Sequence, residues 1–408
     1  MSKRKNEDWD VVIIGAGASG IFAALRCREL SPERSVLVLE KAPKPLRKVT
    51  ISGGGRCNVT HDCHDLDDLL SCYPRGGYRL EPILARFMPT DTIAWFEQRG
   101  VKLKVEADGR MFPVTNRSQT IVDCLLKEAE KLGVQLRTRT RVDALQSRKG
   151  EFLLTGPELK IRAKKVLLAT GGASKATSWL KVMGHKPEED IPSLFTFCCQ
   201  SPIIQELQGL SVQKVGLKLQ TNPRFESEGP LLVTHWGLSG PAVLKLSAFA
   251  ARALWQCQYR AELVCDLLPD LEEDELAVIW EKQNQRKQVF TACPFPEIPK
   301  RLWRKLAESA GVGETQTWKQ LKNQKRVKLA SALKRSSFFV DGKGVFKEEF
   351  VTSGGVELCE MDVYTMESKS VPGLFVAGEL LNVDGITGGF NFQNAWATGF
   401  IAGEGLSS

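Results

Sequence analysis

The sequence predicts an α/β protein in which one domain, built from both ends of the chain, is interrupted by an inserted β domain. Three observations predict this fold class. An apolar run near the amino end leads into a glycine-rich turn, further glycine-rich turns lie near the carboxyl end, and the middle of the chain holds short apolar runs separated by prolines and glycines. With 408 residues, the chain is long enough for two or three domains.

The first glycine-rich turn follows Val11–Ile14, a run typical of a buried strand in a parallel sheet. Gly15, Gly17 and Gly20 then form G-x-G-x-x-G ahead of a helix predicted over 21–30. In this motif the first glycine permits a tight turn, the second lets a pyrophosphate approach the backbone, and the third lets the helix pack close to the strand. The free N–H groups of the helix favour the phosphate. The cofactor-binding residues predicted here are Gly15, Ala16, Gly17, Ala18, Ser19 and Gly20.

A second apolar run over 35–39 ends in Glu40, whose carboxylate is placed to accept hydrogen bonds from an adenosine ribose. Strand, glycine turn, helix, strand and acid in this order predict a Rossmann-type dinucleotide-binding domain, whereas an ordinary glycine turn is the alternative. Lys41, Arg47 and Lys48 come next, near the expected path of the phosphates, and are predicted to bind the same cofactor.

A second cluster of glycines spans 52–58. Three consecutive glycines suggest backbone pressed against a flat ligand or a phosphate, and a flexible loop is the alternative. The thiol in this cluster is either a nucleophile or, as is more common, a packed side chain. The predicted binding residues are Ser52, Gly53, Gly54, Gly55, Arg56, Cys57 and Asn58.

Two later regions repeat the pattern of a buried strand followed by glycines. The first is 165–172, and the second is 372–379 together with the turn ahead of a helix that starts near Asn391. The N-terminus of that helix could stabilise negative charge on a reduced flavin ring, although a purely structural turn is also open. The remaining predicted binding residues are Val142, Thr170, Gly171, Gly172, Gly378, Glu379, Gly388, Gly389, Asn391 and Gln393.

Capping and periodicity predict several further elements. They include a helix capped by Thr90 or Asp91 through 99, a helix from Ser118 to 132, and a hairpin near 148–150. Helices are also predicted over 269–287, 299–310 and 317–334. The predicted domains are 1–192 and 353–408 for the nucleotide, 193–268 and 336–352 for a barrel-like β domain, and 269–335 for a helical subdomain within it.

Net charge and cysteine content limit the classes of binding partner and the cellular compartment that we expect. The net charge is +8, and between 300 and 335 there are 11 Lys or Arg against two Glu. A solvated helix face and a nucleic-acid or anion surface are both consistent with that run. The 11 cysteines are scattered without metal-type spacing, no run of about 18 apolar residues exists, and the first ten residues are polar. We therefore expect a cytoplasmic protein with reduced thiols, no membrane span and no metal site.

At this point the motifs resemble those of the YhiN/BaiN-type, or aminoacetone-oxidase-like, FAD-binding flavoproteins. The matching blocks run from one end of the chain to the other. They are VIIGAGASG (12–20), SGGGRCN (52–58), GRMFPV (109–114), LLATGG (167–172), THWGLSGPAVL (234–244), VTSGGV (351–356), TMESKSVPGLFVAGELLNVDG (365–385) and TGGFNFQNAWATG (387–399).

The resemblance implies a Rossmann-type FAD domain with an inserted β-barrel-like domain that carries a small helical subdomain. It implies non-covalent FAD, with Glu40 on the ribose and with the 52–58 loop and the 388–393 turn beside the isoalloxazine ring. One departure stands out, because family members continue from ATGG into a longer Gly/Ser/Thr-rich segment. Here ASKATSWLKVMGH follows directly after Gly172, which puts pocket shape and activity in question.

We therefore predict an FAD-dependent oxidoreductase that acts on a small organic substrate between the nucleotide domain and the inserted domain, with NAD(P)H or oxygen as a transient electron partner. No catalytic acid or base is assigned. Arg56 and Arg110 either hold an anionic substrate or pin a loop, and His235 is more often a structural residue in such a setting. Two other classes stay open, namely an FAD-containing RNA-binding or RNA-modifying protein and a flavin-binding protein with little turnover.

Overall fold

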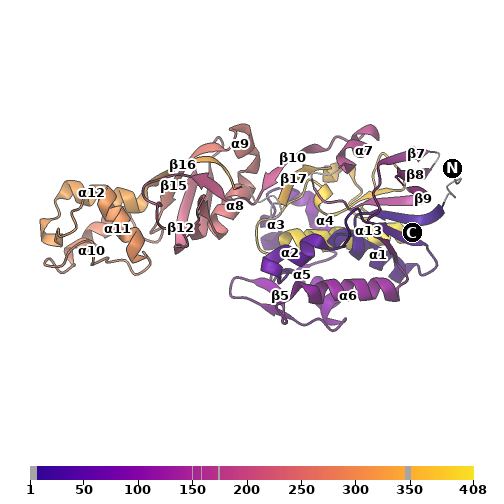
Figure 1. The fold of residues 1–408 in the computed structure, drawn as a ribbon, viewed down its shortest axis with the longest axis horizontal. Helices are drawn as coiled ribbons and strands as arrows, with labels where there is room; N and C mark the ends of the chain where they lie inside the picture. Colours follow the sequence, from indigo (N-terminus) through magenta and orange to yellow (C-terminus); the bar gives the residue numbers. More distant parts are fainter. Residues whose placement is uncertain (1–6, 149, 158, 173–174, 345–350) are drawn as a thin grey trace. The chain divides into compact units, whose positions relative to one another are not determined.

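The computed structural model describes residues 7–148, 150–157, 159–172, 175–344 and 351–408. Its contacts divide the chain into two compact units (Figure 1), unit 1 with residues 1–192 and 351–408 and unit 2 with residues 193–350. Unit 1 has the predicted Rossmann-type architecture and unit 2 contains a closed barrel, so the predicted fold class is confirmed.

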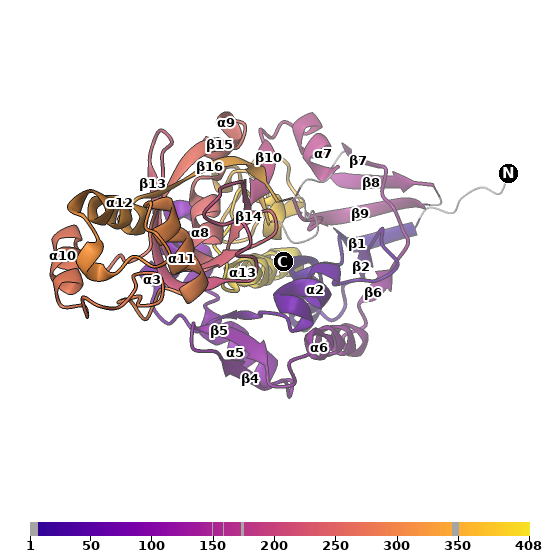
Figure 2. The same cartoon turned by 60° about the vertical axis from the view of Figure 1, so that its left-hand side comes forward.

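The core of unit 1 is a mainly parallel sheet with the strand order β6-β2-β1-β9-β8-β7 and with β18 beside β9; Figure 2 shows most of this succession. In the described residues its strands are β1 (Glu7–Ile14), β2 (Val36–Leu39), β6 (Gln135–Arg137), β7 (Ala144–Arg148), β8 (Glu151–Gly156), β9 (Leu159–Leu168) and β18 (Leu374–Val376). Arg148 pairs with Glu151, so the predicted hairpin is present, although Lys149 lies outside the described residues.

The register of the parallel strands explains why distant turns meet. Ile14 of β1 pairs with Leu39 of β2 and with Leu168 of β9, and Leu168 also pairs with Val376 of β18. The carboxyl ends of four strands are therefore level at one edge of the sheet, which is where open α/β sheets bind ligands. The residues directly after these strands are those that the sequence singled out.

Helix α13 packs along α1, although 359 residues lie between the end of α1 and the start of α13 in the chain. Gly399 and Gly403 permit that contact, because a Cβ at either position would lie within 2.8 Å of a backbone oxygen of α1. The helices of unit 1 are α1 (Ala18–Leu30), α2 (Arg47–Gly55), α3 (Leu66–Ser71), η1 (Gly77–Leu80), α4 (Glu81–Leu84), α5 (Pro89–Glu97), α6 (Ser118–Lys131), α7 (Ala176–Val182), η3 (Leu358–Glu360), η4 (Gly378–Leu380) and α13 (Phe390–Ser407).

Two small sheets complete unit 1. One has the order β3-β5-β4, and the other pairs β10 with β17. Their strands are β3 (Thr60–His61), β4 (Leu103–Val105), β5 (Arg110–Pro113), β10 (Glu188–Ser193) and β17 (Val351–Gly355). The helix α5 begins at Pro89, so Thr90 and Asp91 lie inside its first turn and neither precedes it as predicted. The carboxylate of Asp91 accepts a hydrogen bond from the backbone N–H of Met88, the residue before the helix.

Unit 2 is built on a closed barrel with the strand order β11-β14-β13-β12-β15-β16. Along β12 the side chains of Val215, Leu217 and Leu219 are buried, as expected for one face of a barrel strand. The elements are β11 (Phe197–Cys199), β12 (Ser211–Leu219), β13 (Phe225–Val233), β14 (Gly237–Ser239), α8 (Pro241–Phe249), α9 (Ala251–Gln256), β15 (Arg260–Asp266) and β16 (Ser336–Lys343).

The helical subdomain, residues 269–335, lies between β15 and β16 along the chain. Its elements are α10 (Glu273–Glu281), α11 (Lys300–Ser309), η2 (Trp318–Gln320) and α12 (Asn323–Lys334). The predicted helix over 269–287 is too long at both ends, because Glu272 and Glu275 cap a later start and the helix ends at Glu281. Asp270, which precedes it, forms an ion pair with Lys214. The predicted helix over 317–334 is two elements, because Thr317 and Gln320 close a single 3₁₀ turn before α12 begins.

None of the helices among the described residues combines the length and the apolar character that a bilayer crossing requires.

Candidate functional site

The turn between β1 and α1 has the three features that the glycine motif requires. Gly15 has a φ of +110°, and a Cβ there would lie 2.3 Å from the carbonyl oxygen of Ala169. A Cβ on Gly20 would lie 2.0 Å from the carbonyl oxygen of Gly15, so the helix and the turn touch. Gly17 has no atom within 4 Å of its Cβ position, and no side chain caps the N-terminus of α1 among the described residues. Open space in front of free N–H groups fits a bound pyrophosphate.

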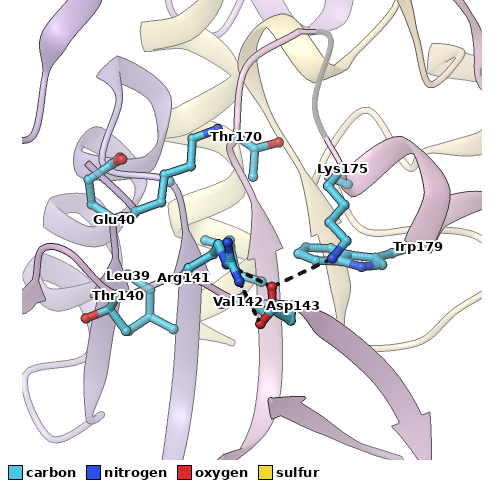
Figure 3. Close-up of a pocket in the computed structure, with 13 residues that line it drawn as sticks. Leu39, Glu40, Thr140, Arg141, Val142, Asp143, Thr170, Lys175 and Trp179 are labelled. Atoms are coloured by element: carbon cyan, nitrogen blue, oxygen red, sulfur yellow. Dashed lines mark hydrogen bonds and ion pairs between the residues drawn. The ribbon is translucent and has the colours of Figure 1, made fainter. Parts of the chain in front are cut away.

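Glu40 lies beside this turn, at the end of β2. Its carboxylate accepts hydrogen bonds from the backbone N–H groups of Ala16 at 3.0 Å and Ala42 at 2.8 Å. The side chain is thereby held at the rim of a cavity of about 330 Å³, shown in Figure 3. The cavity is lined by Ile14, Gly15, Leu39, Glu40, Lys41, Thr140, Arg141, Val142, Asp143, Thr170, Lys175, Ala176 and Trp179.

The wall of the cavity opposite Glu40 was not predicted, with the exception of Val142. Trp179 of α7 is nearly buried, and the ammonium of Lys175 lies 3.7 Å from Asp143, which also pairs with Arg141 at 2.9 Å (Figure 3). These residues belong to a loop and to a short helix that no motif marks. Ala173 and Ser174, the first residues of the segment that departs from the family pattern, lie outside the described residues.

The second glycine cluster forms the end of α2. Its backbone leaves helical dihedral angles at Ser52, and Gly53, Gly54 and Gly55 all have positive φ. Gly54 and Gly55 face open space, whereas a Cβ on Gly53 would lie 2.9 Å from the Phe112 ring. The side-chain oxygen of Asn58 is buried without a hydrogen-bond partner in the described part of the chain. An exposed glycine backbone beside an unused acceptor fits a polar ligand.

The first and second turns meet residues from the later strands. A Cβ on Gly378 would lie 2.5 Å from the Ser19 hydroxyl, and one on Gly171 would lie 3.6 Å from the Glu379 carboxylate. Lys48 of α2 forms an ion pair with Glu379. Gly172 packs on Thr352, whose backbone N–H donates to Glu379 at 2.9 Å. Four distant segments of the chain therefore converge at one edge of the sheet. Arg47 opens α2 one residue before Lys48.

Arg56 and Arg110 both form ion pairs with acidic residues of the loop between β4 and β5. Arg56 pairs with Glu106 at 2.5 Å and stacks over the Phe112 ring, and Arg110 pairs with Glu106 and Asp108. The arrangement matches the loop-pinning alternative, because each guanidinium already has carboxylate partners.

The turn before α13 lies against β3. A Cβ on Gly389 would lie 2.5 Å from the carbonyl oxygen of Thr60, and the Asn391 side chain bonds both backbone groups of Gly385. The predicted role of Gln393 does not fit its place in the fold. Gln393 is fully buried, accepts hydrogen bonds from the hydroxyls of Thr60 and Thr92, and donates to Phe87. Its side chain is committed to packing.

His61 is a candidate that the sequence analysis missed. Its ring stacks on Phe390 at 4.7 Å and lies 3.2 Å from the Cβ position of Gly388. Nδ1 is buried and makes no hydrogen bond within the described residues. Burial holds the pKa of His61 below its ordinary value, so the ring is neutral at pH 7. Nothing in the local sequence marks this residue, because only the turn around Gly388 places it here.

Cys57 is packed rather than reactive. It is completely buried, and burial raises the pKa of its thiol to about 12. The thiolate that a nucleophile needs is therefore scarce at neutral pH. Of the two alternatives given for this thiol, the structure matches a packed side chain.

We expect iodoacetamide at pH 8 to modify the exposed Cys359 in the native protein and to leave Cys57 unmodified until the protein unfolds. Peptide mass spectrometry after timed quenching measures both rates. Cys359→Ser serves as the control that removes the fast phase. Equal labelling rates of the two thiols in native protein would contradict the packing of Cys57.

Comparison with known proteins extends the match to nearly the whole chain. The HI0933-like protein Rossmann domain family matches residues 9–405. The ribosomal RNA dihydrouridine synthase of Escherichia coli (strain K12) is 32% identical over 98% of this chain and 98% of that protein. The 3-dehydro-bile acid delta(4,6)-reductase of Clostridium scindens is 28% identical over 96% of this chain and 97% of that protein.

Solved structures share the fold at lower identity. A flavocytochrome c3 fumarate reductase in its open conformation has a TM-score of 0.52 at 18% identity, covering 98% of this chain and 78% of that chain. The 3-ketosteroid delta1-dehydrogenase from Sterolibacterium denitrificans has a TM-score of 0.50 at 12% identity, covering 98% and 100%. With the family match and these relatives, the protein belongs to the HI0933-like Rossmann-domain family of flavin-dependent oxidoreductases.

Proposed function

We propose that this protein binds FAD non-covalently in unit 1 and reduces a carbon–carbon double bond of its substrate. The convergence of four distant segments at one edge of the sheet carries this proposal. We assign the cofactor to unit 1, residues 1–192 and 351–408, because Val351 and Thr352, which were predicted to belong to the barrel, are part of β17 and this strand pairs with β10. The barrel is then formed by residues 193–268 together with β16, and the helical subdomain by 269–335.

Each part of the site has a role in this proposal. Glu40 and the cavity beside it hold the adenosine end, and the open backbone at Gly17 holds the pyrophosphate. Gly54, Gly55 and the side chain of Asn58 lie along the ring end, where Gly388 and His61 also stand. The neutral His61 offers Nδ1 as a hydrogen-bonding atom there. Bound FAD would supply hydride chemistry that no side chain can perform.

The direction of the reaction is inferred from the relatives. Dihydrouridine is uridine with two hydrogen atoms added, and a delta(4,6)-reductase is named for the double bonds that it reduces. Saturating one double bond consumes two electrons and two protons. We assign the electrons to NADH or NADPH, which binds transiently because the sequence has a single complete G-x-G-x-x-G motif. The 11 free cysteines agree with a reducing cytoplasm.

Anaerobic spectroscopy of the yellow protein tests the proposal. We expect NADH or NADPH to bleach the flavin and an acceptor with a conjugated double bond to restore the oxidised spectrum, with two hydrogens gained by the product. The acceptor panel contains a 4-en-3-one steroid and a uridine-rich RNA, after the two relatives.

Two outcomes would contradict the proposal. A purified protein that is colourless and does not take up added FAD would contradict the proposed binding of FAD. Flavin that stays oxidised with both nicotinamides, or that no acceptor reoxidises after chemical reduction, would favour a flavin-binding protein with little turnover.

A further inference from the structure

The helical subdomain carries an excess of positive charge that its own fold does not use. Between 282 and 335 there are 14 Lys or Arg residues and three acidic residues. Six of the cations are engaged. Lys334 pairs with Asp266, Arg335 with Glu273 and Lys305 with Glu206, whereas the side chains of Arg301, Lys325 and Arg326 bond to oxygen atoms nearby.

The other eight cations are exposed, and their side chains make no hydrogen bond or ion pair with the described residues. They are Lys282, Arg286, Lys287, Lys300, Arg304, Lys319, Lys322 and Lys328. Surface cations of folded proteins usually have acidic neighbours within the same face. Here the acidic residues are concentrated on α10 and the cations on the elements that follow it.

Four of these cations are brought together by backbone pairing, and we call Arg286, Lys287, Lys319 and Lys322 the basic face. The backbone N–H of Lys319 donates to Gln285 at 3.1 Å, and that of Trp318 donates to Lys287 at 3.1 Å. An antiparallel bridge joins Gln288 and Thr317. Arg286 and Lys287 therefore run beside Lys319, and Lys322 follows one turn later, directly before α12.

The basic face stands on a rigid support. Trp318 lies between the cations in sequence, is fully buried and packs between Trp280 and Trp303, each with a ring centroid 6.3 Å away. The indole N–H of Trp303 donates to the Val289 carbonyl at 2.7 Å. The backbone that carries the four cations is thus supported by a packed aromatic core, so binding has to order only the four side chains.

A groove of about 470 Å³ begins at Gln288, the residue that pairs with Thr317. Its lining contains three cations and three carboxylates, and consists of Glu206, Leu207, Gln288, Phe290, Thr291, Arg301, Arg304, Lys305, Glu308 and Glu314. The free guanidinium of Arg304 and the aromatic ring of Phe290 offer a charge and a stacking surface in one depression. This combination is typical of sites for single-stranded nucleic acid.

We propose that the basic face and this groove bind the phosphate backbone of RNA. In the described part of the helical subdomain the exposed large apolar side chains are Val278 and Val327, too few for an amphipathic membrane helix or for the apolar centre of a protein interface. The choice of RNA over another polyanion rests on the proposed reductase function, because uridine in RNA contains the kind of double bond that such an enzyme reduces.

The test compares two variants of the full-length flavoprotein. The first carries Arg286→Gln, Lys287→Gln, Lys319→Gln and Lys322→Gln. The control removes the same number of exposed cations from the barrel, by Lys218→Gln, Arg224→Gln, Lys245→Gln and Arg260→Gln. Both variants change the net charge equally, so a general electrostatic effect would weaken both alike.

Fluorescence anisotropy with a labelled uridine-rich single-stranded RNA, over a series of salt concentrations, gives the affinity and its salt dependence. Each lost phosphate contact lowers the slope of log K against log salt by about 0.7 for a single strand, so the first variant should lose about 3 from the slope. We expect its affinity at low salt to fall by at least about tenfold, and that of the control by less than about threefold.

Several results would overturn the proposal. They are an absence of RNA binding by the parent protein, equal weakening of both variants, or binding to phosphatidylserine vesicles in place of RNA. Reduction of the flavin by NAD(P)H is measured on every variant and should be unchanged. If the flavin of the parent protein is reduced by NAD(P)H but the protein does not bind RNA, only the proposed RNA surface is refuted. If NAD(P)H does not reduce the flavin of the parent protein, the proposed reductase function is refuted.

Discussion

Gly17→Val is expected to fold as well as the parent protein and to lose its FAD. The backbone at Gly17 has a φ of −82° and a ψ of −171°, which a valine adopts without strain, and no atom lies within 4 Å of the new Cβ. The added side chain fills the space proposed for the pyrophosphate. We expect the dissociation constant for FAD to rise by at least about 100-fold, equivalent to about 2.7 kcal/mol.

The measurement separates cofactor binding from stability. Melting temperatures are compared on apoproteins, because bound FAD would itself raise the melting temperature of the parent. Gly20→Val is the matched control, because its Cβ would lie 2.0 Å from the carbonyl oxygen of Gly15 and cost about 3 kcal/mol or more of stability. A yellow Gly17→Val protein with the affinity of the parent would contradict the assignment of the pyrophosphate to this turn.

Arg75→Ala is expected to destabilise the protein by about 3–5 kcal/mol, because it leaves a buried carboxylate without its main partner. Arg75 donates to both carboxylate oxygens of Asp384, whose side chain is 0% exposed. The same two residues form a backbone bridge that joins the loop before η1 to the segment leading to Gly388. Urea denaturation of apoprotein at pH 7 gives the free energy of unfolding.

Two further variants control this prediction. Arg162→Ala removes an ion pair with Asp8 in which both side chains are about half exposed or more, so it should cost less than about 1 kcal/mol. Arg75→Ala combined with Asp384→Ala should be less unstable than Arg75→Ala alone, because no unpaired charge remains buried. A loss below about 1 kcal/mol for Arg75→Ala would show that Asp384 does not depend on this arginine.

The features that the sequence predicted well are those fixed by neighbours along the chain. Strand β1, the glycine turn and α1 follow from apolar runs and from glycines at set spacing, and Glu40 follows from the length of β2. The registers of β1, β9 and β18 then bring the separate turns to one edge, as expected for parallel strands. The prediction that these turns meet succeeded because the turns at Gly15, Glu40, Thr170 and Gly378 each follow a strand of the same sheet.

Other features depend on contacts that no local pattern reveals. Gln393 lies in a glycine-rich motif, yet its amide is used by Thr60, Thr92 and Phe87 inside the protein. His61 reaches the site only because β3 lies beside the turn at Gly388. The helix predicted over 299–310 agrees with α11 to within one residue at each end. The helices predicted over 269–287 and 317–334 were too long, because side-chain caps at the first turns of α10 and η2 compete with helix propensity and decide where these elements start.

The packing of α13 on α1 has a consequence for how the chain matures on the ribosome. The first residue of α13 is synthesised about 360 residues after the last residue of α1, an interval of roughly 20 to 70 s at usual rates of synthesis. Throughout this interval the apolar side of α1, with Phe22 among its residues, lacks the helix that will cover it. The nascent protein thus exposes an apolar surface until α13 has been made, whereas residues 193–350, which form the other compact unit, are all synthesised before α13.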